Sequence, residues 1–345
     1  TSFSFLMIGG GAVFMGQAVD RFGPRAVVTL AGIIFGLGYG LLFRMQAVWE
    51  LYLYVGLLAG IGLAAHDVST LSTIARWFVR RRGLMSGITK AGGGGGQVIV
   101  PTFMAAMIAG PGWRIACLAF GITAIVVLVG AAQTLRRSPA SLGLKPDDET
   151  PDPATNPAQQ EDGATFRQAL GSKALWLLCI AKFCDLFCLF TIIVHIVSFG
   201  VDRGLHPAIA AGVLSTIGAM SIAGRLVLGG AYDLFGARRS LLACFSLLTA
   251  SLMWLQFADT TWSLFLFAAI YGPAHGGFFT VTSPSVAEFF GTRAHGTLFG
   301  LVISCGTFGA TLGPIVAGSL FDVWGSYTVA FALLLGFSLT GLAVA

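Results

Sequence analysis

The sequence predicts an all-α membrane protein made of two tandem helical bundles. Hydrophobic residues make up 56% of its 345 residues and charged residues only 10%, whereas soluble domains carry about 25% charged residues. Long windows without any charge recur along the chain, and one motif returns 213 residues after its first copy. The composition therefore excludes a soluble domain, and the windows and the repeat indicate the architecture.

Eleven apolar segments are long enough to cross a bilayer. A helix rises about 1.5 Å per residue and the hydrocarbon core is about 30 Å thick. Lipid excludes open strands, so segments of 18 to 28 residues are expected to be helices. The segments are 1–19, 26–43, 49–75, 83–108, 113–135, 174–201, 206–232, 239–258, 261–288, 294–320 and 325–345.

The basic residues in the loops indicate the orientation of these segments. Fourteen Lys and Arg residues lie in one set of alternate loops, and three (Arg44, Arg114 and Arg203) lie in the other. Cytoplasmic loops carry the excess of positive charge. We therefore expect the first set, including the central loop, to be cytoplasmic, in a protein of a bacterial inner (plasma) membrane.

An internal repeat divides the chain into halves. The stretch "GQAVDRFGPR" at 16–25 is echoed by "GGAYDLFGAR" at 229–238, and the same shift carries Gly83 to Gly296 and Pro101 to Pro314. The first half has five segments and the second has six, so we expect a further helix before Thr1. The eleven segments are then helices 2 to 12 of two tandem six-helix bundles.

The repeat and the composition give the domain boundaries. Residues 1–137 form the N-terminal bundle (helices 2–6) and 173–345 the C-terminal bundle (helices 7–12). The intervening residues 138–172 are rich in Pro, Asp, Glu and Gln, and they lack the apolar content needed to fold. They are predicted to be a flexible cytoplasmic linker.

These features resemble a known family. Two six-helix halves, a central cytoplasmic loop and G-x-x-x-D-R-x-G-x-R at 16–25 resemble the major facilitator superfamily. Within it, "ARWFVRRRGLMSGI" (75–88) and "GRLVLGGAYD" (224–233) are similar to the monocarboxylate transporters and oxalate/formate antiporters. The resemblance implies a secondary active transporter, not an enzyme, that moves a small organic anion by alternating access, as proton symport or anion exchange.

The resemblance carries over one substrate residue. It implies that Arg225, eight residues before Asp233, engages a substrate carboxylate. Ser221 stands where monocarboxylate carriers have an aspartate, and 294–320 has no lysine where oxalate carriers have one. Two alternatives stay open: a carrier of neutral or amphipathic solutes, such as a drug exporter, and a receptor on the same fold.

Charged groups inside the apolar segments are the candidate functional residues, because burying them in lipid is costly. Arg225 and Lys90 are expected to bind the anion, although Arg225 could instead pair with Asp185 and Lys90 with Asp67. His275 either lines the cavity or is a hydrogen-bonded core histidine. The groups that either couple a proton or form buried ion pairs are Asp67, Asp185 and Lys182.

Two further sets of residues concern motion. The repeated loops are expected to form a cytoplasmic latch in which acids cap helix ends beside arginines. Its members are Asp20, Arg21, Arg25, Asp233 and Arg238. The glycines of "KAGGGGGQ" follow the lysine, unlike a phosphate-binding loop, and small residues allow close helix packing in lipid. The packing residues are predicted to be Gly83, Gly87, Gly92, Gly95 and Gly96.

The expected partners follow from these assignments. They are the organic anion, a proton or counter-anion, and the lipid bilayer, and the carrier is expected to work as a monomer. The basic residues lie in short loops between apolar segments, so no nucleic acid is expected. The scattered cysteines and histidines give no metal-ligand spacing, and neither a cofactor nor a metal is expected.

Overall fold

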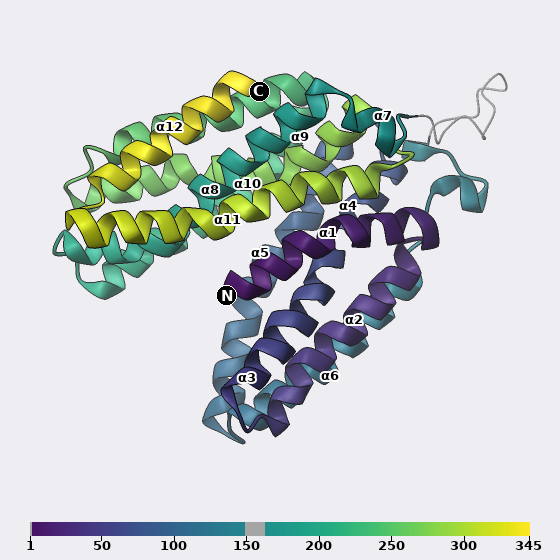
Figure 1. The fold of residues 1–345 in the computed structure, drawn as a ribbon, viewed down its shortest axis with the longest axis horizontal. Helices are drawn as coiled ribbons and strands as arrows, with labels where there is room; N and C mark the ends of the chain where they lie inside the picture. The colour runs from purple at the N-terminus through teal and green to yellow at the C-terminus, as the bar shows by residue number, and fades with distance from the viewer. Residues whose placement is uncertain (1, 149–162) are drawn as a thin grey trace. The chain divides into compact units, whose positions relative to one another are not determined.

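The computed structural model describes the backbone of residues 2–148 and 163–345 (Figure 1). Side chains are described there except at residues 2, 3, 94, 95, 97, 98, 102 and 148. Within these ranges the chain is nearly all helical, and the isolated bridge between Gly163 and Gly291 is the one β pairing. The all-α prediction is therefore confirmed.

The chain divides into two compact units that share two helices. The first unit is Thr1–Arg80, Gly92–Gly171 and Phe289–Ser304, and the second is Arg81–Ala91, Ser172–Glu288 and Cys305–Ala345. Helix α5 (Arg82–Ala109) begins in the second unit and continues in the first, whereas α11 (His295–Trp324) begins in the first. The predicted bundle boundaries at residues 137 and 173 stay predictions.

The first unit packs its helices in pairs. Helix α2 (Pro24–Leu41) runs along α6 (Trp113–Thr134), and α1 (Ser2–Phe22) packs against α4 (Gly60–Trp77) (Figure 1). Helix α4 is the last part of a continuous helical stretch, Val48–Trp77, which covers the predicted segment 49–75. The remaining elements before α4 are the 3₁₀ helix η1 (Leu42–Arg44), α3 (Val48–Leu51) and the π-helix η2 (Tyr52–Ala59).

Short helices occupy the described ends of the predicted linker. They are the 3₁₀ helices η3 (Pro139–Leu142) and η4 (Pro146–Asp148) and the helix α7 (Phe166–Leu170). Thr165 and Gln168 form a capping box at the start of α7, which satisfies amides that a short helix would leave open. Residues 149–162 of the predicted linker lie outside the described residues.

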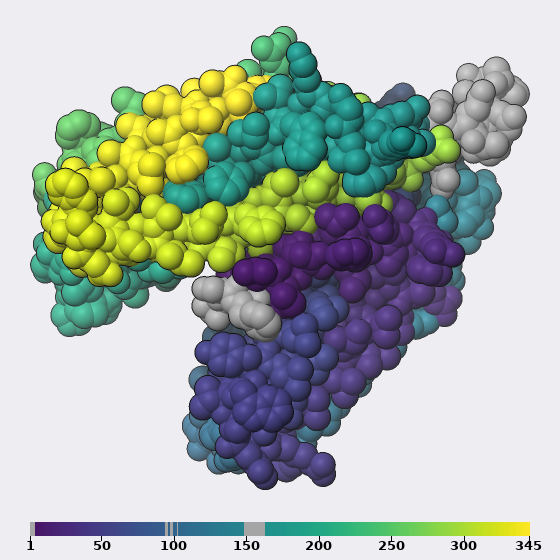
Figure 2. Space-filling view, viewed as in Figure 1, coloured from purple at the N-terminus to yellow at the C-terminus, as the bar shows by residue number. Residues whose placement is uncertain are grey.

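The second unit is built from long helices. They are α8 (Lys173–Asp202), α9 (Pro207–Leu255), α10 (Thr261–Phe290) and α12 (Thr328–Val344), with the ends of α5 and α11 that belong to it. Helices α11, α8 and α12 lie side by side on the face shown in Figure 2. Glycines allow the α8–α11 contact, because a Cβ at Gly309 would overlap the carbonyl oxygen of Phe183.

Two equivalent glycines of the repeated sequence motif share the same unusual backbone conformation. Gly23, between α1 and α2, has φ 83° and ψ 162°, and Gly236, inside α9, has φ 76° and ψ −178°. This region of backbone conformation is essentially restricted to glycine. Gly236 therefore divides α9 into 207–235 and 237–255, which correspond to the two segments predicted at 206–232 and 239–258.

Several helices meet the requirements for crossing a membrane. By length and hydropathy, seven described helices are long and apolar enough. They are Pro24–Arg44, Val48–Trp77, Trp113–Thr134, Lys173–Asp202, Pro207–Leu255, Thr261–Phe290 and His295–Trp324. As one straight helix, the 49 residues of α9 would span about 74 Å at 1.5 Å per residue, more than twice the hydrocarbon thickness, but Gly236 divides them into two helices. The count of eleven spans stays a prediction.

Candidate functional site

Three cationic side chains gather around the ring of Phe279 in the second unit. The distances to the ring centroid are 5.4 Å from Lys182 Nζ, 5.5 Å from Lys90 Nζ and 5.6 Å from Arg225 Cζ. The cations come from α8, α5 and α9, and the ring comes from α10. Each lies within about 6 Å, the range of cation–π attraction. We call these four residues the Phe279 cluster.

The start of α5 brings Lys90 to this cluster. Arg225 Nη1 donates a hydrogen bond to the carbonyl oxygen of Lys90, 2.6 Å away. The helices come this close because a glycine faces α9 on each of two successive turns. A Cβ at Gly87 would overlap the carbonyl oxygen of Arg225, and one at Gly83 would overlap that of Gly229. These two glycines therefore set the distance between two of the cations.

Lys182 forms a buried ion pair within α8. Its Nζ lies 2.6 Å from Asp185 Oδ2, and the exposed fractions of the two side chains are 3% and 0%. Gly306 of α11 packs directly on this pair, since a Cβ there would lie 2.8 Å from Lys182 Cγ. Removal of either partner would leave the other charge buried, which costs several kcal/mol. Of the two readings that the sequence left open for Lys182 and Asp185, a buried ion pair is therefore present, whereas proton coupling stays a prediction.

His275 lies beside the cluster on α10. Its Nδ1 is 2.8 Å from the hydroxyl of Ser221, and its ring meets that of Phe279 edge to face with centroids 5.2 Å apart. Ser221 is one helical turn before Arg225 on α9. The residue that replaces the aspartate of the monocarboxylate carriers therefore engages a histidine next to the cations.

Asp67 belongs to the first unit rather than to the unit that holds the Phe279 cluster. Its Oδ1 lies 3.2 Å from His66 Nδ1, and the exposed fractions of the two side chains are 35% and 55%. Asp67 was identified because it lies inside an apolar segment, and that signal leaves undetermined which side of the helix the residue faces. A role for Asp67 in coupling stays a prediction.

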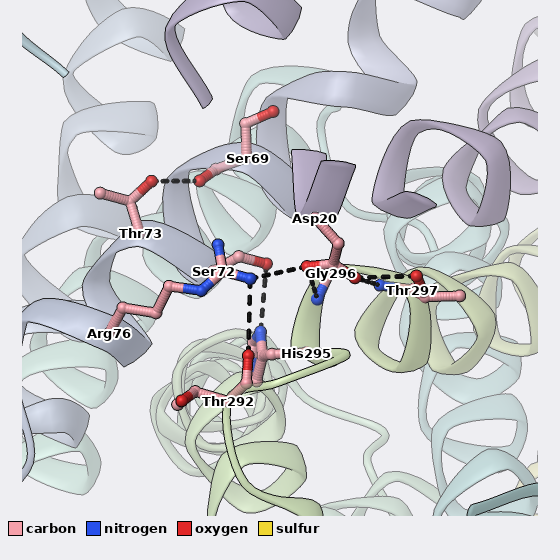
Figure 3. A network of polar contacts seen from close by, with 9 residues as sticks. All are labelled: Asp20, Ser69, Ser72, Thr73, Arg76, Thr292, His295, Gly296 and Thr297. Atoms are coloured by element: carbon pink, nitrogen blue, oxygen red, sulfur yellow. Dashed lines mark hydrogen bonds and ion pairs between the residues drawn. The ribbon is translucent and has the colours of Figure 1, made fainter. Parts of the chain in front are cut away.

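The first latch acid, Asp20, holds the N-terminus of α11 (Figure 3). Its carboxylate accepts hydrogen bonds from the amides of Gly296 (3.1 Å) and Thr297 (2.8 Å) and from the Thr297 hydroxyl (2.8 Å). Arg76 Nη2 also lies 2.7 Å from Asp20 Oδ1. A negative charge at a helix N-terminus meets unpaired amides and the positive end of the helix dipole.

The second latch acid, Asp233, does the same at the start of α5. It accepts hydrogen bonds from the amides of Gly83 (2.6 Å) and Leu84 (2.9 Å). Gly83 and Gly296 are 213 residues apart, as are Asp20 and Asp233. Two equivalent acids therefore cap two equivalent helices, one in each unit.

The arginines assigned to the latch have other surroundings. Arg25, on the first turn of α2, faces α6 and donates to Gln133 Oε1 from Nε (2.9 Å) and Nη2 (2.5 Å). Arg21 lies over the ring of Phe22, and Arg238 is exposed.

Sequence reasoning missed one partner of a latch acid, Arg76, and several polar contacts near both acids. Arg76 was counted only as a positive charge of the cytoplasmic loops, yet its side chain is 3% exposed. His295, the first residue of α11, is buried and lies 3.1 Å from the Ser72 hydroxyl. Near Asp233, Glu288 accepts hydrogen bonds from the Tyr232 hydroxyl and the Ala237 amide. The run of basic residues around Arg76 concealed its individual role.

The predicted glycine packing is present at only part of α5. Among the described residues nothing lies within 4 Å of a Cβ built at Gly92 or Gly96, and the surroundings of Gly95 lie outside them. The two glycines instead line a cavity of about 570 Å³ in the first unit. Its walls include Phe35, Leu63 and Phe120. Close packing is therefore a property of the start of α5, where Gly83 and Gly87 face α9.

Comparisons with known proteins agree with this architecture. A sequence profile of the Major Facilitator Superfamily matches residues 1–233 and 215–345. Monocarboxylate transporter 13 of Rattus norvegicus is 30% identical over 95% of this chain and 74% of its own length. Monocarboxylate transporter 11 of Homo sapiens is 30% identical over 92% of this chain and 68% of its own length. Both are eukaryotic, so they give no support to the predicted bacterial membrane.

Solved structures show the same fold. The human organic anion transporter MFSD10 superposes with a TM-score of 0.77 at 17% identity, covering 99% of this chain and 81% of its own. The E. coli fucose:proton symporter FucP gives a TM-score of 0.73 at 12% identity, covering 99% and 90%. The profile, the relatives and the fold are all those of transporters. The chain therefore belongs to the Major Facilitator Superfamily, as an integral membrane transporter close to the monocarboxylate transporters.

Proposed function

We propose that this transporter carries a small organic anion of the monocarboxylate type by alternating access, as proton symport or anion exchange. The observation that supports this proposal is the Phe279 cluster, in which Lys90, Lys182 and Arg225 approach one ring. The names of the relatives point to the same substrate class. We further propose that the carrier works as a monomer with its central loop in the cytoplasm.

The charges of the cluster favour an anionic ligand. Lys182 has a carboxylate partner in Asp185 at 2.6 Å, and Lys90 and Arg225 add two more positive charges around the same ring. The planar fork of Arg225 can bind a carboxylate through two parallel hydrogen bonds. A second cation beside it adds Coulomb attraction for the same carboxylate.

The two helix caps support the alternating-access part of the proposal. Each cap joins an acid to backbone amides of a helix that begins in the same unit, so each is able to break and reform without covalent change. Opening toward the cytoplasm would release α11 from Asp20 and α5 from Asp233. Capping contacts of about 1 kcal/mol suit such a switch, because both states then remain populated.

Counterflow in liposomes tests the proposed substrate class. Vesicles loaded with unlabelled pyruvate, lactate or formate should accumulate the labelled anion through the wild-type protein. Arg225→Ala and Arg225→Lys should abolish or strongly reduce this uptake, whereas Arg44→Ala, at an exposed arginine, should leave it unchanged. Uptake that survives both Arg225 changes would instead favour a carrier of neutral or amphipathic solutes. Binding without counterflow would favour a receptor.

The open glycine face supports the predicted further helix. In the second half, Cβ atoms at Gly306, Gly309 and Gly313 would collide with α8. The 213-residue shift carries these positions to Gly93, Gly96 and Val100, on the open part of α5. We propose that an apolar helix equivalent to α8 covers this face. In a protein extended upstream of Thr1, Gly96→Leu should then lower the melting temperature, whereas it should have little effect on residues 1–345 alone.

A further inference from the structure

The start of the central linker is bound to the turn between α4 and α5. Asp147, in η4, accepts hydrogen bonds at Oδ2 from the amides of Val79 (2.6 Å) and Arg80 (2.5 Å). Both amides lie in that turn. The indole Nε1 of Trp77, the last residue of α4, donates a hydrogen bond to the carbonyl oxygen of Arg136 (3.0 Å). The segment that leaves α6 therefore contacts both the end of α4 and the turn after it.

The backbone of Asp147 has an unusual conformation. Its φ is 55° and its ψ is 20°, in the left-handed region. Among the described residues it is the one non-glycine residue with a positive φ. Aspartate adopts this region more readily than most residues, and such conformations persist where the surrounding contacts hold them. Two hydrogen bonds to an ionised carboxylate are strong enough to be such contacts.

The other described end of the linker is paired with the loop between α10 and α11. Gly163 forms the isolated antiparallel bridge with Gly291, and the amide of Ala164 donates to the carbonyl oxygen of Phe290 (2.9 Å). A Cβ at Gly163 would lie 2.5 Å from that oxygen, so this approach requires a glycine. The next residue, Thr165, caps α7. The chain is therefore held on both sides of Ala164.

The two loops that the linker contacts are equivalent in the internal repeat. The 213-residue shift carries the turn at 78–81 to 291–294. Each loop leads directly into a helix whose first amides are capped by a latch acid. Asp233 caps α5 and Asp20 caps α11. The linker contacts and the caps therefore act on the same two connections.

We propose that the two ends of the linker are clamps that position these loops for the caps. Asp147 holds the loop before α5, and the bridge between Gly163 and Gly291 holds the loop before α11. A contact that is made in only one of two states favours that state. The clamps should therefore favour the state in which both helices are capped. Asp147 and Gly163 are positioning residues, and their control of transport rests on the proposed alternating access.

Hydrogen–deuterium exchange of the purified full chain tests the first clamp. In Asp147→Ala, the amides of Val79 and Arg80 should exchange at least about tenfold faster, because their acceptor is gone. Asp147→Asn should have an intermediate effect, because its amide oxygen can still accept both hydrogen bonds but carries no charge. Asp322→Ala, at another exposed acid, should leave the exchange of both amides unchanged.

A pair of glycine variants tests the second clamp. Gly163→Ala should speed the exchange of the Ala164 amide, because the new Cβ overlaps the carbonyl oxygen of Phe290. Gly171→Ala is the matched control, since a Cβ there would make an ordinary contact of 3.5 Å with the carbonyl oxygen of Gln168. It should leave the exchange of the Ala164 amide unchanged.

Thiol labelling tests whether the clamps control opening. In a protein without native cysteines, Ser221→Cys should react severalfold faster with an impermeant thiol reagent from the cytoplasmic side when Asp147→Ala or Gly163→Ala is also present. The controls Asp322→Ala and Gly171→Ala should not change the labelling rate. A loss of stability alone is separated from this effect by measuring the melting temperature of each variant.

Three results would overturn the proposal. Unchanged exchange at Val79 and Arg80 in Asp147→Ala would exclude the first clamp, and unchanged exchange at Ala164 in Gly163→Ala would exclude the second. Faster exchange with an unchanged labelling rate would show that the linker holds the loops without controlling opening. If the wild-type protein shows no counterflow of any anion, the proposed substrate class fails instead, and the exchange and labelling measurements still decide the clamps.

Discussion

The guanidinium of Arg225 donates a hydrogen bond to the backbone carbonyl oxygen of Lys90, 2.6 Å away. This bond uses the main chain of α5, so it fixes the two residues relative to each other whatever side chain stands at position 90. The Lys90 side chain is directed to the ring of Phe279 instead. The backbone carbonyl of Lys90 therefore positions Arg225, whereas the side chain of Lys90 adds a positive charge to the cluster.

This separation allows the Lys90 charge to be tested alone. Lys90→Met keeps the carbonyl contact and a flexible side chain but removes one positive charge from the cluster. A hydrogen bond between a lysine and a carboxylate contributes about 1.5 to 3 kcal/mol. If Lys90 binds the anion, the KM for a monocarboxylate should therefore rise roughly 10- to 150-fold. Liposome uptake over a range of substrate concentrations measures it. Lys173→Met, at the exposed start of α8, is the matched control, and an unchanged KM in Lys90→Met would exclude contact with the anion.

The Lys182–Asp185 pair is open to a double-mutant cycle. Asp185→Leu alone leaves Lys182 buried without its partner, which should cost about 3–5 kcal/mol and lower the melting temperature strongly. The double variant Lys182→Met/Asp185→Leu should recover most of that stability, because no charge remains buried. Thermal unfolding in detergent measures both effects.

The same double variant separates a structural pair from a coupling site. If the pair is structural, the recovered protein should still take up anion and should still respond to an imposed proton gradient. A variant that folds and binds but has lost its response to the gradient would assign proton coupling to Asp185.

The caps at Asp20 and Asp233 were partly predictable from the sequence. The repeat identified both acids and placed them at helix ends. Their partners could not be found in the same way, because Asp20 and Gly296 are 276 residues apart and no local pattern links them. The repeat contained an additional clue, since Gly83 and Gly296 share the same shift as the two acids.

For the Phe279 cluster, the sequence identified the charged residues but not the ring around which they gather. Its three cations were identified because charges in apolar segments are unusual. Phe279 could not be, because one phenylalanine among 28 in an apolar chain carries no signal of its own. Which charges meet depends on the facing side of each helix, and a charge in an apolar segment carries no signal of that side.

The cap at Asp20 is expected to favour the state in which α11 is held. Asp20→Asn keeps the shape of the side chain, but it removes the charge that faces the α11 N-terminus and Arg76 and replaces one of the two accepting oxygens by an NH2 donor. A loss of about 1 kcal/mol at such a site corresponds to about a fivefold shift in population. A single cysteine at Ser221, in a protein without native cysteines, should then react faster with an impermeant thiol reagent from the cytoplasmic side. Asp202→Asn, at the far end of α8, should have no effect. Equal labelling rates in Asp20→Asn and the parent would contradict a latch.

Two glycines on α5 form a matched pair for the packing argument. Alanine favours a helix over glycine by about 1 kcal/mol at either Gly87 or Gly92. At Gly87 the new Cβ would overlap the carbonyl oxygen of Arg225, whereas at Gly92 no described atom lies within 4 Å. Gly87→Ala should therefore lower the melting temperature and reduce uptake, because it forces α5 away from α9 and separates Lys90 from Arg225. Gly92→Ala should be neutral or slightly stabilising in the same assays. Equal behaviour of the two variants would show that the contact between α5 and α9 does not set the geometry of the Phe279 cluster.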